Sequence, residues 1–153
     1  KGGREHCNCV LFSCVVKVRV MKQGAVPAGI VGFDFIKANR ERLGKIVCTS
    51  GGFDPVHPGH LSCITESAGY GDTLIVVVNG DEFLTRKKGR AFQDLHTRCR
   101  IISYIRGVDF VVPHEAGEDM TVCGALRLIR PHVFTKAIIY LTNQNKRGYD
   151  VGA

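Results

Sequence analysis

The chain has 153 residues, of which 44% are hydrophobic and 23% are charged, and its formal net charge is +7. This length and composition suit a globular protein with one domain and a buried core, and they are short for two domains. The longest apolar runs fall far short of the roughly 20 residues that a membrane span needs, so no membrane partner is expected.

The positive charge is unevenly distributed along the chain. Residues 1–44 carry eight Lys and Arg against three Asp and Glu, whereas residues 45–136 carry eleven against ten. A nucleic-acid-binding domain usually has a broad basic face, and the balanced central region argues against one. A polyanion-binding module built on the basic N-terminal arm stays open as a minor alternative.

The seven cysteines suggest a reducing compartment. Cys7 and Cys9 are the only close pair, and no histidine or acidic cluster accompanies them at the spacing of a zinc site. An odd number of cysteines, some in apolar segments, is typical of cytoplasmic proteins that keep their thiols reduced. We therefore expect a cytoplasmic protein and assign no metal-ligating residues.

The N-terminal segments have weaker patterns. Residues 10–20 form an apolar run whose second half alternates with basic residues, and they are predicted to be a strand. Residues 21–32 are interrupted by glycine and proline and read as a linker. Residues 33–43 fit a short amphipathic helix that stops at Gly44. Residues 1–44 are accordingly treated as an N-terminal extension, partly irregular.

From Lys45 onward, strand and helix patterns alternate regularly. The strands are short apolar runs, and the helices are longer runs with apolar residues three or four positions apart. A polar stretch at 81–92 is predicted to be a loop. The four predicted strands are 45–50, 73–80, 109–113 and 132–136, and the three predicted helices are 60–71, 93–107 and 118–131.

This alternation predicts an α/β fold. Strands that are apolar on both faces belong in a parallel sheet covered by helices on both sides. Right-handed crossovers then give a Rossmann-like three-layer sandwich with a mostly parallel sheet. Ligands of such folds bind at the carboxyl ends of the strands. The stretch "GGFDPVHPGH", residues 51–60, follows the first of these strands and lies at that edge.

The residues of this stretch suit phosphate binding. Pro58 fits the first turn of a helix, where the missing N–H costs nothing, so His57 lies at the helix start and His60 one turn later. Gly51 and Gly52 allow the backbone to approach a ligand closely. The N-terminal helix dipole favours an anion, and two imidazoles can stabilise growing negative charge. A plain Gly- and Pro-rich turn with incidental histidines is the simpler alternative.

The stretch resembles the GxFDxxHxGH signature of the nucleotidyltransferase superfamily named for its HxGH motif. The resemblance continues in order over residues 45–136 and is closest to glycerol-3-phosphate cytidylyltransferases and to the adenylyltransferase domain of ADP-heptose synthases. Its further blocks are "AGYGDTLIVVVNGDEF", "KKGRAFQDLHTRCRIISYIRGVDFVVP" and "ALRLIRPHVFTK".

The resemblance implies transfer of CMP or AMP from CTP or ATP to a phosphorylated sugar or polyol, with release of pyrophosphate. The acceptor phosphate would attack the α-phosphorus directly, without a covalent enzyme intermediate. A Mg²⁺ ion bound to the triphosphate would be the cofactor. The expected partners are CTP or ATP and a phosphorylated small molecule, and a homodimer is left open.

Carried over by position, the resemblance assigns roles within the motif itself. His57 and His60 would be catalytic and would stabilise charge on the α-phosphate and the departing pyrophosphate. The residues Gly51, Gly52 and Phe53 would lie against the nucleotide.

Five further residues receive roles in the same way. Asp54 is grouped with the nucleotide-binding residues and is expected mainly to order the turn. Lys87, Lys88 and Arg90 would belong to a mobile basic loop that closes on phosphates, with Lys88 counted as catalytic. Arg98 occupies the position of a phosphate-binding arginine in "DLHTR" and is also counted as catalytic.

The resemblance ends after residue 136. The family continues with a Gly-Gly-Asp segment that contacts base and ribose, whereas residues 137–153 read as an unrelated tail. The sheet is therefore expected to be incomplete at its C-terminal side, and the role of Lys136 is left open. A nucleotide-binding remnant without turnover is accordingly the main alternative to an active enzyme.

Overall fold

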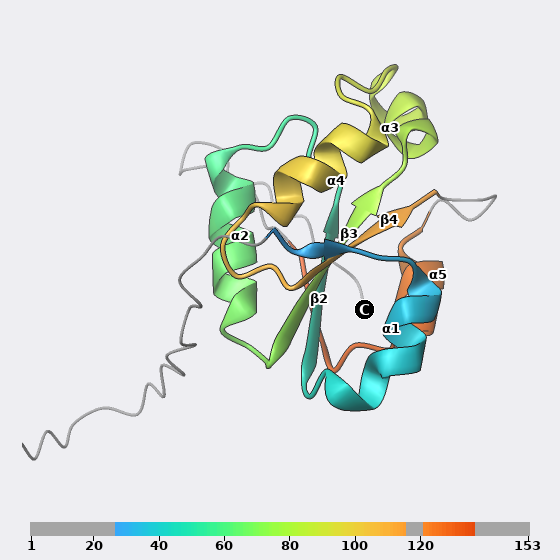
Figure 1. Ribbon diagram of the computed structural model, residues 1–153. Coiled ribbons are helices and arrows are strands. Elements are labelled where there is room, and N and C mark those ends of the chain that lie inside the picture. The colour runs from blue at the N-terminus through green and yellow to red at the C-terminus, as the bar shows by residue number, and fades with distance from the viewer. Residues whose placement is uncertain (1–26, 116–120, 137–153) are drawn as a thin grey trace, which may run out of the picture.

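The computed structural model describes residues 27–115 and 121–136. Together they form one parallel sheet with helices on both faces (Figure 1). The strands are β1 (Gly29–Ile30), β2 (Ile46–Gly51), β3 (Thr73–Asn79), β4 (Phe110–His114) and β5 (Val133–Thr135). The helices are α1 (Phe33–Asn39), the 3₁₀ turn η1 (Arg40–Arg42), α2 (Pro58–Ala68), α3 (Asp81–Lys88), α4 (Leu95–Ser103) and α5 (Cys123–Ile129).

The five strands are ordered β1-β4-β3-β2-β5, and each pairs with its neighbours in parallel. The chain runs from β2 to β3 to β4 toward one edge and then returns, so that β5 lies on the other side of β2. The strand order thus reverses between β2 and β5, where the crevice at the carboxyl ends of a doubly wound sheet binds ligands. The predicted α/β, Rossmann-like, mostly parallel sheet is confirmed.

Two apolar layers hold the sheet between its helices. Helices α2 and α4 cover one face, and α1 and α5 cover the other (Figure 1). Successive residues of β3 point to opposite faces of the sheet and belong to different layers. Val76 packs with Ile64 and Ile102 on the first face. Val77 packs with Ile36 on the second. Burial on both faces explains why β3 is apolar at almost every position.

Residues 81–92 are not the predicted polar loop, because 81–88 form α3. Two acidic residues, Asp81 and Glu82, occupy its first turn, and basic residues its last turn, which complements the helix dipole. Gly89 ends it with a left-handed φ of 88° that glycine adopts readily. The charge run that resembled a solvated loop is therefore an exposed helix with one buried residue, Leu84.

The segment before the predicted core also contributes to the fold. Gly29 and Ile30 of β1, which belong to the predicted linker, pair with β4. Ile36, a residue of α1 within the predicted helix, is buried. The boundary at residue 44 stays a prediction, although this part of the extension packs on the sheet. The predicted strand at 10–20 and the tail at 137–153 lie outside the described residues.

No helix within the described residues is long and apolar enough to cross a membrane.

Candidate nucleotide-binding site

The candidate site lies where β2 ends and α2 begins. Strand β2 ends at Gly51, and α2 begins at Pro58 with His57 as its extended N-cap residue. Proline lies at the first helical position, where a backbone N–H would have no partner within the helix, as the sequence pattern predicts. The motif therefore bridges a central strand and a helix N-terminus at the ligand edge of the sheet.

The two motif histidines are in direct contact. Their rings stack with centroids 3.6 Å apart, and the backbone N–H of His57 donates to Nδ1 of His60 at 3.3 Å. Since Nδ1 accepts this bond, the neutral ring carries its proton on Nε2 and presents an N–H donor there. Burial lowers the pKa of His60 to about 4, with the nearby His57 and Lys88 acting in the same direction. His60 is therefore a neutral donor near neutral pH.

Phe53 packs against the ring of His60. Its ring is 4% exposed and meets the His60 ring edge-on, with centroids 5.0 Å apart. Phe53 adopts φ 51°, which is unusual for a residue with a side chain and is a common kind of strain at functional sites. A Cβ at Gly51 would lie 3.0 Å from the Phe53 ring, so glycine lets the ring pack against β2.

Asp54 organises the loop that follows α3. Its buried carboxylate accepts hydrogen bonds from the backbone N–H groups of Phe92, at 2.6 Å, and Gln93, at 2.9 Å. The Lys88 ammonium donates to the backbone oxygen of Asp54 at 3.4 Å. These contacts tie the end of α3 and the loop after it to the turn that follows β2.

Arg98 is entirely buried and acts inside the protein framework. Its guanidinium donates to the backbone oxygens of Gly52 at 2.7 Å, Asn79 at 2.6 Å and Gln93 at 2.9 Å. It also forms an ion pair with Asp81 at the start of α3. Arg98 thus joins the ends of β2 and β3 to α3, and all of these contacts are with protein groups.

A pocket of about 150 Å³ opens between β2, α2 and the end of β5. It lies at the reversal of strand order, where topology predicts a ligand crevice. His60 and Phe53 connect it to the motif. Its lining residues are Thr49, Ser50, Gly51, Phe53, His60, Cys63, Ile64 and Lys136.

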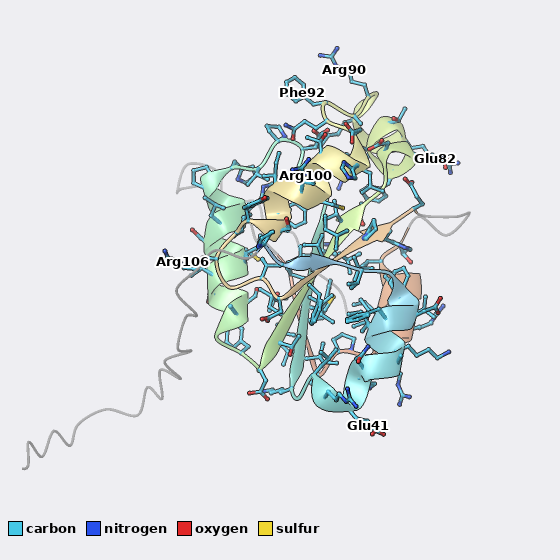
Figure 2. All side chains as sticks on the ribbon, viewed as in Figure 1. Glu41, Glu82, Arg90, Phe92, Arg100 and Arg106 are labelled. Atoms are coloured by element: carbon cyan, nitrogen blue, oxygen red, sulfur yellow. The ribbon has the colours of Figure 1, made fainter. Side chains whose placement is uncertain are left out.

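The structure does not bring all the predicted residues equally close to this pocket. Lys87 lies over the ring of Phe83, with 5.7 Å between its Nζ and the ring centroid. Arg90 and Phe92 project outward from the loop after α3 (Figure 2), and Phe92 is 70% exposed. Lys87 and Arg90 are therefore on the outer side of the site, whereas Lys88 contacts the turn.

Sequence reasoning missed part of the pocket wall. Thr49 and Ser50 are the last residues of β2 before its terminal glycine, and Cys63 faces them from α2. Lys136, whose role the sequence left open, lines the same pocket. The sequence feature that they share is their place in the predicted elements. Each lies at the carboxyl end of a strand or in the first turns of the helix that follows. Only the strand order shows that these positions meet.

The described residues do not offer a protein-built metal site. No group of three or more His, Cys, Asp or Glu side chains in 27–115 and 121–136 is arranged to hold a metal ion. The Asp54 carboxylate is engaged with two backbone N–H groups. A Mg²⁺ ion at this site would therefore need oxygen ligands other than a side-chain cluster of the described residues.

Comparison with known proteins identifies the family of the region that contains the site. The profile of the cytidylyltransferase-like family matches residues 48–143. That range contains the histidine motif, the pocket wall on α2, and Arg98.

Curated relatives named bifunctional protein HldE match the same region. The protein of Gluconobacter oxydans is 37% identical over 65% of this chain and 21% of its own length. That of Actinobacillus pleuropneumoniae is 42% identical over 60% of this chain and 20% of its own length. That of Methylococcus capsulatus is 35% identical over 77% and 24%. The chain therefore spans between a fifth and a quarter of the length of these relatives.

Among solved structures, the lipopolysaccharide core biosynthesis protein of Thermoplasma volcanium is similar. It superposes with a TM-score of 0.52 at 29% identity, and the match covers 60% of this chain and 72% of that protein. A likeness at this level extends to sequence as well as fold.

Proposed function

We infer that this chain, which belongs to the cytidylyltransferase-like family, catalyses nucleotidyl transfer to a phosphorylated small molecule. CMP or AMP would pass from CTP or ATP to the phosphate of a sugar or polyol, with release of pyrophosphate. The observation that carries this proposal is the His57–His60 pair, which presents a fixed N–H donor beside a pocket at the strand-order reversal.

The proposed reaction is a direct displacement at phosphorus. An oxygen of the acceptor phosphate forms a bond to the α-phosphorus of the nucleotide, and the bond from that phosphorus to the bridging oxygen breaks. The bonding electron pair leaves with pyrophosphate, so negative charge grows on the departing oxygens. Positioned donors in a site that excludes water stabilise such charge most effectively.

His60 is suited to this task because it does not need to ionise. Its Nδ1 is occupied by the backbone N–H of His57, and its Nε2–H remains directed as a donor. The ring of His57 stacks on that of His60 at the exposed N-terminus of α2 and would reach the phosphates of the departing pyrophosphate. Both histidines are thus proposed to be catalytic.

Other residues would act around these histidines. Lys88, held near the backbone of Asp54, would neutralise phosphate charge at the turn. Gly51, Gly52 and Phe53 would lie against the nucleotide. Lys87 and Arg90, on the outer surface, would contribute attraction for the anionic substrates rather than fixed contacts.

Arg98 is better described as a positioning residue. It is fully buried and holds the backbone oxygen of Gly52, so its effect on the reaction would pass through the glycine turn. Asp54 would act similarly by fixing the loop before α4.

A Mg²⁺ ion, when bound to the triphosphate, would neutralise charge and orient its oxygens. The chain's own donors would then complete the neutralisation from the protein side.

The relatives suggest the class of acceptor. The resemblance of residues 45–136 to the adenylyltransferase domain of ADP-heptose synthases, together with the likeness to a lipopolysaccharide core biosynthesis protein, favours ATP and a sugar phosphate. CTP with a polyol phosphate is the second combination to test. The four described cysteines are free thiols, which supports a reducing, cytoplasmic setting.

A product assay tests this proposal. The protein would be incubated with MgCl₂, with CTP or ATP, and with a panel of sugar and polyol phosphates, and nucleotide-linked products would be identified by mass spectrometry. Formation of one such product together with stoichiometric pyrophosphate is expected. Nucleotide binding without product from any acceptor would contradict turnover and favour the nucleotide-binding remnant.

A further inference from the structure

The side of the pocket opposite α2 ends in a lysine to which the histidine motif assigns no role. Lys136 follows β5 directly, and β5 pairs with β2 on the side away from β3. His60 lines the pocket from α2, and Lys136 lines it from the end of β5. The two residues are 76 positions apart in sequence, yet both border the space where the strand order reverses.

Partly buried hydrogen bonds hold Thr135, the residue directly before Lys136. The hydroxyl of Thr135, the preceding residue, lies 2.7 Å from the hydroxyl of Ser67 on α2. The Thr135 hydroxyl has one proton, which it donates to Ser67 Oγ or, at the longer distance of 3.4 Å, to the backbone oxygen of Cys48 in β2. Ser67 is 1% exposed, and its hydroxyl donates to the backbone oxygen of Cys63 at 2.6 Å. The short edge strand β5 is therefore joined to both β2 and α2 immediately before Lys136.

The chemistry of the pocket wall selects an anion. The eight lining residues include no carboxylate. They include the hydroxyl-bearing Thr49 and Ser50, His60, whose Nδ1 accepts a hydrogen bond so that Nε2 carries the proton, and the cationic Lys136. An ammonium group without an acidic partner in the same wall, beside neutral hydrogen-bond donors, suits a phosphoryl group.

The volume of the pocket limits what can enter it. At about 150 Å³, it is smaller than the roughly 300 Å³ or more of a pocket for a whole small molecule. A phosphoryl group fits this space.

We propose that Lys136 binds a phosphoryl group of the substrates from the β5 side of the pocket, opposite His60, and that the Ser67–Thr135 hydrogen bond positions it. This inference rests on the proposed function for the identity of the substrates. It adds a phosphate-binding residue to those of the histidine motif and the lysines of α3.

Pyrophosphate and inorganic phosphate, each with MgCl₂, are the first probes, measured by isothermal titration calorimetry on the full chain. Lys136→Met removes the charge and keeps most of the side-chain length. Lys37→Met on α1 is the matched control, because Lys37 is also exposed but belongs to the opposite face of the sheet. Lys136→Met is expected to weaken pyrophosphate binding at least tenfold, as loss of a charge-assisted hydrogen bond predicts, and Lys37→Met is expected to leave it unchanged.

A second pair of measurements identifies the source of the phosphoryl group. If Lys136 holds the nucleotide, Lys136→Met weakens binding of CTP or ATP and leaves that of the acceptor phosphate unchanged. If it holds the acceptor, the order reverses. Either result supports the inference, and equal affinities of Lys136→Met and the unaltered protein for every probe would overturn it. Failure of the unaltered protein to bind pyrophosphate would overturn it as well.

A separate variant tests whether Thr135 positions Lys136. Thr135→Val removes the hydroxyl but keeps the shape of the side chain, so the lysine charge remains while its anchor is lost. We expect weaker pyrophosphate binding than in the unaltered protein, with a smaller loss than for Lys136→Met. Unchanged affinity in Thr135→Val would remove the positioning role. Nucleotide transfer that depends on His57 and His60 but not on Lys136 would leave the proposed function intact while this inference fails.

Discussion

The backbone N–H of His57 donates a hydrogen bond to Nδ1 of His60 at 3.3 Å, so the N-cap of α2 fixes the tautomer of the ring three residues later. The ring is thereby held with Nε2–H as its donor, and no acidic side chain in 27–115 or 121–136 is found to pair with it. Protonation of Nδ1 would break this bond, and burial opposes the added charge. The same contact links local helix capping to the proposed chemistry.

This arrangement predicts a specific pH dependence of stability. The pKa of His60 is about 4 in the folded protein and 6.5 in the unfolded chain. Between these values the unfolded chain binds more protons, so the free energy of unfolding falls as pH drops from 6.5 toward 4. Above 6.5 the ring is neutral in both states, and this contribution is fully present.

The variant His60→Gln lacks the titrating group and is the comparison. Urea unfolding of both proteins would be measured at about pH 7 and about pH 4.5. We expect the unaltered protein to lose more stability than His60→Gln over this range. Identical losses in the two proteins would show that His60 titrates normally when folded.

Arg98 should matter for stability far more than its helical position suggests. Arg98→Met leaves the backbone oxygens of Gly52 and Asn79 and the Asp81 carboxylate without their donor. A buried hydrogen-bond acceptor left without its donor typically costs about 1–3 kcal/mol of unfolding free energy, whereas the Asp81 side chain, which is 43% exposed, can be hydrated instead. Chemical denaturation would measure this loss.

Arg86 provides the matched control, because it also pairs with an acidic residue on α3. Both Arg86 and Glu82 have side chains that are 55% exposed. Arg86→Met should therefore cost no more than about 0.5 kcal/mol, as is usual for exposed pairs four residues apart in a helix. Comparable losses for the two arginines would contradict the buried positioning role of Arg98.

The four described cysteines should differ sharply in reactivity. Burial raises the pKa of Cys48 to about 12 and that of Cys99 to about 11, so neither forms a thiolate readily. Cys123 is exposed, and Cys63 is partly exposed and lines the pocket. Alkylation of the native protein should therefore modify Cys123 quickly, Cys63 more slowly, and Cys48 and Cys99 hardly at all.

Peptide mass spectrometry would follow each cysteine separately. Adding CTP or ATP with MgCl₂ should slow modification of Cys63 but not of Cys123, because only Cys63 borders the pocket. Modification of Cys63 at the same rate with and without nucleotide would place the nucleotide elsewhere.

The fold could be predicted largely from local sequence patterns. Strands β2 and β3 were evident because parallel strands buried on both faces are apolar throughout, and the helix at Pro58 follows from its proline and the preceding turn. Helix α3 was misread, although Asp81 at its start, the lysines at its end and Gly89 after it are ordinary helix signals. The density of charge at 81–92 favours a solvated loop, but these boundary residues begin and end a helix.

The site was less predictable because two of its features depend on tertiary structure. The expected phosphate contact of Arg98 stays a prediction, and nothing local in the sequence indicates that its guanidinium also contacts Gly52, Asn79, Gln93 and Asp81. Their acceptors come from three segments that only the folded sheet brings together. Lys136 likewise joins the pocket only because β5 lies on the far side of β2.

The most direct test of the central claim is the rate of pyrophosphate release in the double variant His57→Ala/His60→Ala. It would be measured with MgCl₂, the preferred nucleotide and its acceptor, beside the unaltered protein and the exposed control His96→Ala, which lies on α4. Loss of transition-state donors predicts a fall in kcat of about 100-fold or more for the double variant and no change for His96→Ala. Turnover by the double variant at the rate of the unaltered protein would contradict the assignment of the two histidines to the reaction.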